Sequence, residues 1–82
     1  MTSAQDVVER VVALLGWVGD VRIVPGGDGT EARIVHDAEA WWLPITGTRP
    51  QEPPWRALVR EGVGEDHLAC VHRSLRALVG QG

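Results

Sequence analysis

The stretch "VRIVPGGDGTEARIVHDAEAWWLPI", residues 21–45, decides the fold of this 82-residue chain. Its apolar residues are mostly β-branched and alternate in part with polar ones, which is typical of strands. Proline, glycine and aspartate separate the first two runs at residues 25–30, and an Asp-Gly step tolerates the positive φ angles of a hairpin turn. We therefore expect strands over residues 21–24, 31–36 and 40–46, joined in chain order by turns.

Helical signals flank this stretch on both sides. Ser3 followed by Asp6 matches a capping box, and Gly16 and Gly19 offer the end of the first helix. Pro53 can begin a short helix, and an amphipathic pattern covers residues 65–79. The sequence predicts an α+β fold, in which an N-terminal and a C-terminal helix flank a three-stranded antiparallel meander. A short extra helix precedes the last one.

Length and composition bound the class of protein. A chain of this size forms one domain, residues 1–82, and its 44% apolar and 23% charged residues are typical of globular proteins. The single cysteine, Cys70, forms no internal disulfide, and the N-terminus lacks the pattern of a signal peptide. The longest uncharged stretch, residues 40–48, is far shorter than the roughly 20 residues that cross a bilayer. We expect a cytoplasmic domain without membrane contact.

The charge pattern argues against nucleic acid as a partner. The net charge is −3, and the eight basic residues, all arginine, are scattered among acids. The order helix–strand–strand–strand–helix is shared with double-stranded-RNA-binding domains, and the topology therefore resembles that family. The family needs a lysine-rich start to its last helix to bind phosphates, whereas Gly64, Glu65 and Asp66 at that position would repel them.

A glycine-rich string after the first strand offers an alternative function. The string "GGDGT" resembles the nucleotide-binding loop of the diacylglycerol kinase and NAD kinase superfamily over five residues. The resemblance implies a small-molecule or nucleotide site at Gly26, Gly27, Asp28, Gly29 and Thr30. Such a loop leads into a helix whose N-terminus faces the phosphate. The hairpin instead requires a strand directly after the loop, and the residues there favour a strand but also fit a helix.

Candidate catalytic and metal-binding groups do not converge. His67 and Cys70 share one face of the last predicted helix, but His72 points away from both, and two ligands do not make a zinc site. His36 and Asp37 lie between two strands, where polar residues form a turn. We predict no catalytic residue, no metal and no cofactor, and we keep a thiol-dependent enzyme built on Cys70 as a third hypothesis.

Trp41 and Trp42 are the residues that say most about function, because they bear on which faces of the sheet are covered. Neighbouring side chains of a strand point to opposite faces of the sheet, so each face needs cover for one indole. Three arrangements provide it. The first and last helices can cover opposite faces, or one face can dock on a partner, most economically a second copy. In the third, the chain is a monomer and residues 47–55 half-cover one indole.

The leading hypothesis is a non-enzymatic protein–protein interaction or adaptor module, either self-associating as a homodimer or docking another protein. Tryptophan, proline and arginine concentrate in residues 41–56, a composition enriched in interaction hot spots. Trp17 and Trp55 also fit the role of core or rim anchors beside the helices. The residues predicted to contact a protein partner are Trp41, Trp42, Arg49, Trp55 and Arg56.

Overall fold

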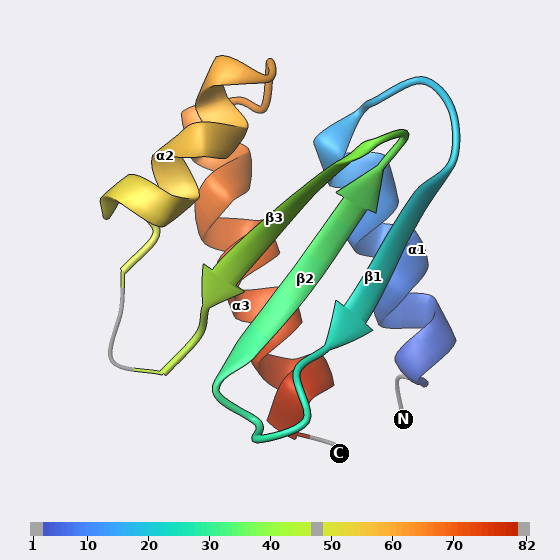
Figure 1. Ribbon diagram of the computed structural model, residues 1–82, viewed down its shortest axis with the longest axis vertical. Helices are drawn as coiled ribbons and strands as arrows, with labels where there is room; N and C mark the ends of the chain where they lie inside the picture. The colour runs from blue at the N-terminus through green and yellow to red at the C-terminus, as the bar shows by residue number, and fades with distance from the viewer. Residues whose placement is uncertain (1–2, 47–48, 81–82) are drawn as a thin grey trace.

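A computed structural model describes residues 3–46 and 49–80 of the chain. Its elements follow the predicted α+β order, with a meander of three strands between helices and a short helix before the last one (Figure 1). The elements are α1 (Ala4–Leu15), β1 (Val21–Pro25), β2 (Glu31–His36), β3 (Glu39–Pro44), α2 (Pro53–Arg60) and α3 (Glu65–Gly80).

The predicted caps of the first helix are confirmed. The Asp6 backbone N–H donates to Ser3 Oγ over 3.1 Å, and the Asp6 carboxylate accepts from the Ser3 N–H, so the capping box is complete. Gly16 ends α1 in the left-handed region, with φ of 69°, a conformation that costs glycine little. The helix therefore begins and ends where its local sequence directs.

The sheet is antiparallel with strand order β1-β2-β3. Glycine-rich residues after Pro25 form the turn between β1 and β2, where the Gly26 N–H donates to the Glu31 carbonyl over 2.8 Å. Asp37, with φ of 56°, begins the tight turn between β2 and β3, and aspartate is among the residues that accept this backbone conformation. The register places Val24, Arg33 and Trp42 side by side across the three strands.

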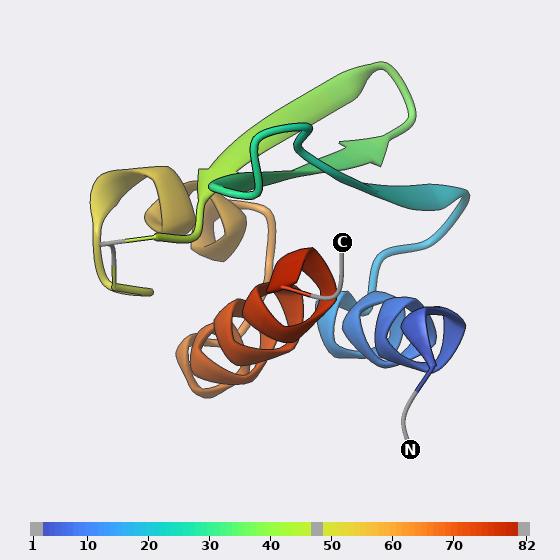
Figure 2. The same ribbon diagram turned by 90° about the horizontal axis from the view of Figure 1, so that it is seen from below.

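Both long helices lie on the same face of the sheet. Figure 2 shows α1 and α3 side by side beneath the strands, while α2 lies next to β3. The arrangement in which the first and last helices cover opposite faces is therefore wrong. The physical reason is that the apolar stripes of α1 and α3 join one shared core, whereas a helix on each face would divide the apolar residues of this small chain between two cores.

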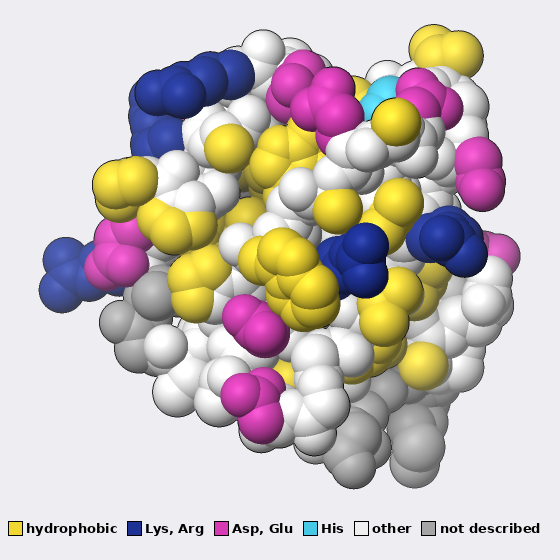
Figure 3. Space-filling model, in the orientation of Figure 1, with side chains coloured by type: hydrophobic (Ala, Val, Ile, Leu, Met, Phe, Trp, Pro, Cys, Tyr) yellow, Lys and Arg dark blue, Asp and Glu magenta, His cyan; other side chains and the backbone are white. Residues whose placement is uncertain are grey.

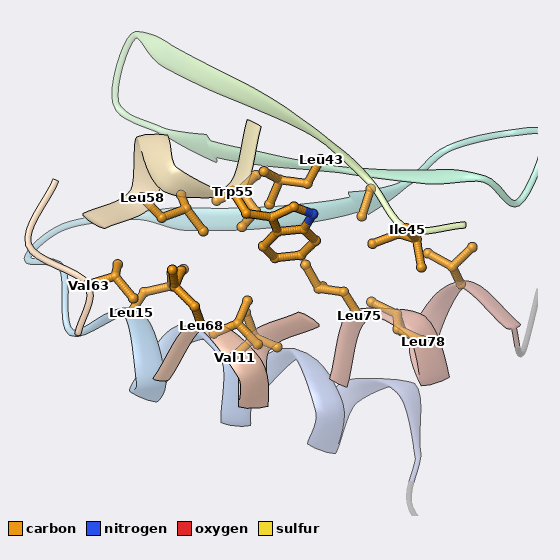
Figure 4. Close-up of a cluster of buried hydrophobic side chains, with 14 of the residues drawn as sticks. Val11, Leu15, Leu43, Ile45, Trp55, Leu58, Val63, Leu68, Leu75 and Leu78 are labelled. Atoms are coloured by element: carbon orange, nitrogen blue, oxygen red, sulfur yellow. The ribbon is translucent and has the colours of Figure 1, made fainter. Parts of the chain in front are cut away.

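The core lies between the sheet and the three helices, and every element except β1 contributes buried residues to it. Figure 4 shows the Trp55 indole in the middle of this layer, between Leu43 of the sheet and Leu75 of α3. The largest fully buried side chains are Trp55, Ile34, Leu43, Leu58, Leu75, Val11, Val63 and Val71.

Candidate functional site: the open face of the sheet

No helix among the described residues covers the sheet face opposite α1 and α3 (Figure 2). On the helix side, Ala32, Ile34 and Leu43 are fully buried, so their strand neighbours point the other way. We call this surface the open face. By alternation and register, its residues are Arg22, Val24, Glu31, Arg33, Val35, Ala40, Trp42 and Pro44.

Trp42 is the most prominent side chain of the open face. It is 53% exposed, and Val24, two strands away in the same register row, is 46% exposed. Between them, the Arg33 guanidinium carbon lies 5.2 Å from the centroid of the Trp42 ring, which is a cation–π contact. Figure 3 shows hydrophobic side chains gathered in the middle of this face, with basic side chains among them.

The charged groups of the open face have no ion-pair partners within residues 3–46 and 49–80. The ion pairs in this part of the chain join His36 with Asp37 and Arg56 with Glu65. Arg22, Glu31 and Arg33 take part in neither, and the Nε atom of Arg33 is buried without a hydrogen-bond partner. The face thus combines exposed apolar side chains with charges that nothing in the described chain neutralises.

Trp41 lies on the helix side, as the alternation of the strand requires. Its ring packs at 5.0 Å from the ring of Trp17, which also stacks on His36 at 5.0 Å. The Trp17 indole N–H donates to the Glu61 carbonyl over 2.9 Å. Trp41 and Trp17 are therefore partly buried rim anchors that join the sheet to the α2–α3 connection. The predicted opposite orientation of Trp41 and Trp42 is thus confirmed, and Trp41 lies outside the surface that carries Trp42.

Trp55 belongs to the core and not to a docking surface. Its side chain is 0% exposed, its indole N–H donates to the Pro44 carbonyl over 2.9 Å, and its ring packs at 4.8 Å from that of His72. A fully buried indole cannot touch a partner without unfolding, so the prediction of Trp55 as a contact residue is wrong. Its other predicted role, as an anchor of the core, is confirmed.

Arg49 and Arg56 lie away from the open face's central strand. Arg49 is exposed in the connection before α2, and Arg56 pairs with Glu65 over 2.6 Å. Arg56 and Glu65 also line a pocket of about 370 Å³ between the connection before α2 and the start of α3. Because Glu65 already occupies the Arg56 guanidinium, this pocket offers no unpaired cation. Its lining residues are Pro50, Gln51, Arg56, Glu65, Asp66, Leu68 and Ala69.

The glycine-rich string forms a hairpin turn. The Thr30 N–H donates to Asp28 Oδ1 over 3.0 Å, and Gly29 adopts a φ of 77°. A strand, β2, follows directly, so the turn lacks the helix N-terminus that a phosphate-binding loop of this kind presents. The loop therefore lacks one feature that the nucleotide-binding alternative requires. The Asp28 side chain instead accepts a hydrogen bond within the turn.

The Asp28 carboxylate makes the stability of this turn pH-dependent. The hydrogen bonds from Thr30 lower the pKa of Asp28 below its ordinary value of 3.8. A carboxyl with a lowered folded-state pKa stabilises the fold above its unfolded-state pKa, and this contribution disappears as the pH falls through the folded-state pKa. We expect Asp28→Asn, which keeps the acceptor oxygen, to unfold at a lower urea concentration than wild type near neutral pH. The difference should shrink as the pH falls below about 4, and a difference of equal size at neutral and at acidic pH would contradict this role.

His72 and His67 take part in packing and local hydrogen bonding. His72 is buried against Trp55, and His67 Nδ1 lies 3.2 Å from the Leu14 carbonyl. Cys70 is partly buried. Within the described residues, no group of three or more His, Cys, Asp or Glu side chains is arranged to hold a metal ion. That part of the chain also contains no helix with the length and apolar character that crossing a membrane requires.

Comparison of this chain with protein-family models, with curated proteins and with solved structures finds no match. Sequence analysis named Trp42 as a contact residue but did not name Val24, Glu31 and Arg33, which lie on the same face. The signal was present in the hairpin, because counting back from the turn at Asp28 pairs Val24 with Arg33 on one face.

Proposed function

We propose that this protein is a non-enzymatic interaction module that self-associates, with two copies packing open face to open face. One observation carries the proposal: Trp42, on the edge strand β3, is 53% exposed on a sheet face that no described helix covers. Val24 and Val35 supply further apolar surface on the same face. Exposed apolar surface that is concentrated on one face is typical of protein-interaction sites.

The energetics favour a reversible dimer. An indole buries about 150–250 Å², so covering the exposed half of Trp42 contributes about 2–3 kcal/mol per copy at roughly 25 cal/mol per Å². Three strands about 4.8 Å apart and about 17 Å long make a face smaller than the roughly 800 Å² per partner of a standard interface. We therefore expect dissociation in the micromolar range.

The substitution Trp42→Ser tests the proposal. Sedimentation velocity and light scattering across a concentration series should show wild type passing from monomer to dimer. Trp42→Ser should raise the dissociation constant at least about tenfold, because large aromatic residues that become buried on binding dominate interface energetics. The monomer fold should persist, since Trp42 lies outside the core. Thermal unfolding of the dilute protein checks this point.

Val18→Ser is the matched control for this experiment. Val18 is 92% exposed but lies in the connection before β1, outside the open face. Its substitution removes apolar surface without removing surface from the proposed interface, so the dissociation constant should not change. Wild type that stays monomeric up to millimolar concentration, or dimers that Trp42→Ser leaves intact, would overturn the proposal.

A further inference from the structure

The open face is arranged in rows across the strands, and the order of charges along it is asymmetric. The first row contains Val24, Arg33 and Trp42. The second row lies nearer the β1–β2 turn, and the third lies nearer the β2–β3 turn. The second row is Gly26, Glu31 and Pro44, and the third is Arg22, Val35 and Ala40.

Two-fold symmetry limits how two such faces can pack. Homodimers are usually isologous, so the same patch must complement itself. A two-fold axis that runs between the sheets and across the strands lays each strand over its own copy in the reverse direction. With the axis between the first and second rows, Glu31 comes over Arg33 of the partner subunit and Pro44 over Trp42 of the partner subunit. Each contact then occurs twice.

Other positions of the axis leave the charges unpaired. An axis parallel to the strands along β2 brings Arg33 over the partner's Arg33, and two like charges at the centre of an interface are costly. An axis between the first and third rows covers Arg33 with the partner's Val35, which buries a guanidinium without a counter-charge. Only the first arrangement gives both Arg33 and Glu31 an opposite charge.

The surroundings of Arg33 fit this arrangement. Its guanidinium is already held over Trp42 at 5.2 Å, and its Nε has no hydrogen-bond partner among the described residues. Glu31 takes part in no ion pair in this part of the chain. Both residues lie on the central strand, close to the axis, where the angle of about 30° between packed sheets displaces facing residues least. At the rim, the same axis brings the turn that carries Asp28 toward Arg22 of the partner subunit.

We infer that the two copies pack with a two-fold axis across the strands, so that Glu31 of each pairs with Arg33 of the other and Pro44 of each covers the other's Trp42. This inference rests on the proposed self-association and specifies its geometry. The pairing is reciprocal, since each copy supplies one acid and one base to the centre of the interface. The open face therefore recognises a second copy of this chain through the order of its charges as well as through apolar contact.

Charge-swap variants test this geometry. Arg33→Glu alone sets two carboxylates against each other at both central pairs, and Glu31→Arg alone sets two guanidinium groups against each other there. Each variant alone should raise the dissociation constant about 10- to 100-fold. Mixed in equal amounts, the two variants should form a heterodimer, because both central pairs are then opposite in charge. Native mass spectrometry identifies the heterodimer, since the two variants differ in mass.

The outcomes separate the geometry from the proposed function. Recovery of dimers on mixing supports the geometry and shows that both variants are folded. The matched controls Arg76→Glu and Glu9→Arg, exposed on α3 and α1, should dimerise like wild type alone and when mixed. Wild-type dimers without recovery in the charge-swap mixture, although circular dichroism shows both variants folded, would overturn the geometry and leave self-association standing. A monomeric wild type would overturn both.

Discussion

Replacing Trp55 by alanine is expected to remove a large part of the stability of this domain. The indole is 0% exposed and lies at the meeting point of β3, α2 and α3. A buried Trp→Ala substitution costs about 3–5 kcal/mol, against a total of roughly 4–12 kcal/mol for a chain of this length. The thermal midpoint should fall by at least about 15 °C, which differential scanning calorimetry measures.

Two further variants show that this loss comes from the core position. Trp55→Phe keeps an aromatic ring but loses the N–H that donates to the Pro44 carbonyl, so it should cost about 1–2 kcal/mol. Trp42→Ala removes an indole of the same size from the open face and should change the unfolding free energy of the monomer by less than about 1 kcal/mol. Similar losses at both tryptophans would contradict the placement of Trp55 in the core.

The second large effect is expected when Ile34 is replaced by aspartate. Ile34 is fully buried on the helix side of β2, whereas its neighbour Val35 is partly exposed on the open face. Ile34→Asp removes a buried side chain and places a carboxylate in the core, which should cost more than about 4 kcal/mol. Val35→Asp places the same charge on the other face, and the monomer should stay folded.

Circular dichroism and urea unfolding of the two aspartate variants check this contrast. Ile34→Asp should lose cooperative unfolding, while Val35→Asp should keep a midpoint near that of wild type. The two variants lie on the same strand, introduce the same residue and change the net charge equally. The difference between their unfolding midpoints therefore shows which face of the sheet packs against the core. Two unfolded variants, or two folded ones, would contradict the two-sided sheet.

Most of the secondary structure could be predicted from the sequence because local signals determine it. The capping box at Ser3, the left-handed stop at Gly16 and the turn after Pro25 each act over a few residues. The opposite orientation of Trp41 and Trp42 follows from the period of a strand. These features need no knowledge of distant parts of the chain.

The side of the sheet chosen by the helices could not be predicted in this way. The apolar stripes of α1 and α3 fit either face of the sheet, and only their packing in one shared core decides between the faces. The role of Trp55 was ambiguous for the same reason, because its burial depends on β3 and α3 as well as on its own helix. At the open face, Trp42 was identified from alternation, while Arg33 required the register of the hairpin.

The placement of the two ends of the fold has a consequence for anything tethered to this domain. Figure 1 shows that α1 begins and α3 ends at the same end of the molecule, and Figure 2 places both helices on the side away from the open face. A protein or peptide joined to the start of α1 or the end of α3 would therefore lie on the outer side of a face-to-face dimer. A two-fold axis across the strands reverses the strand direction of the second copy. The two attached segments would therefore lie at opposite ends of the dimer.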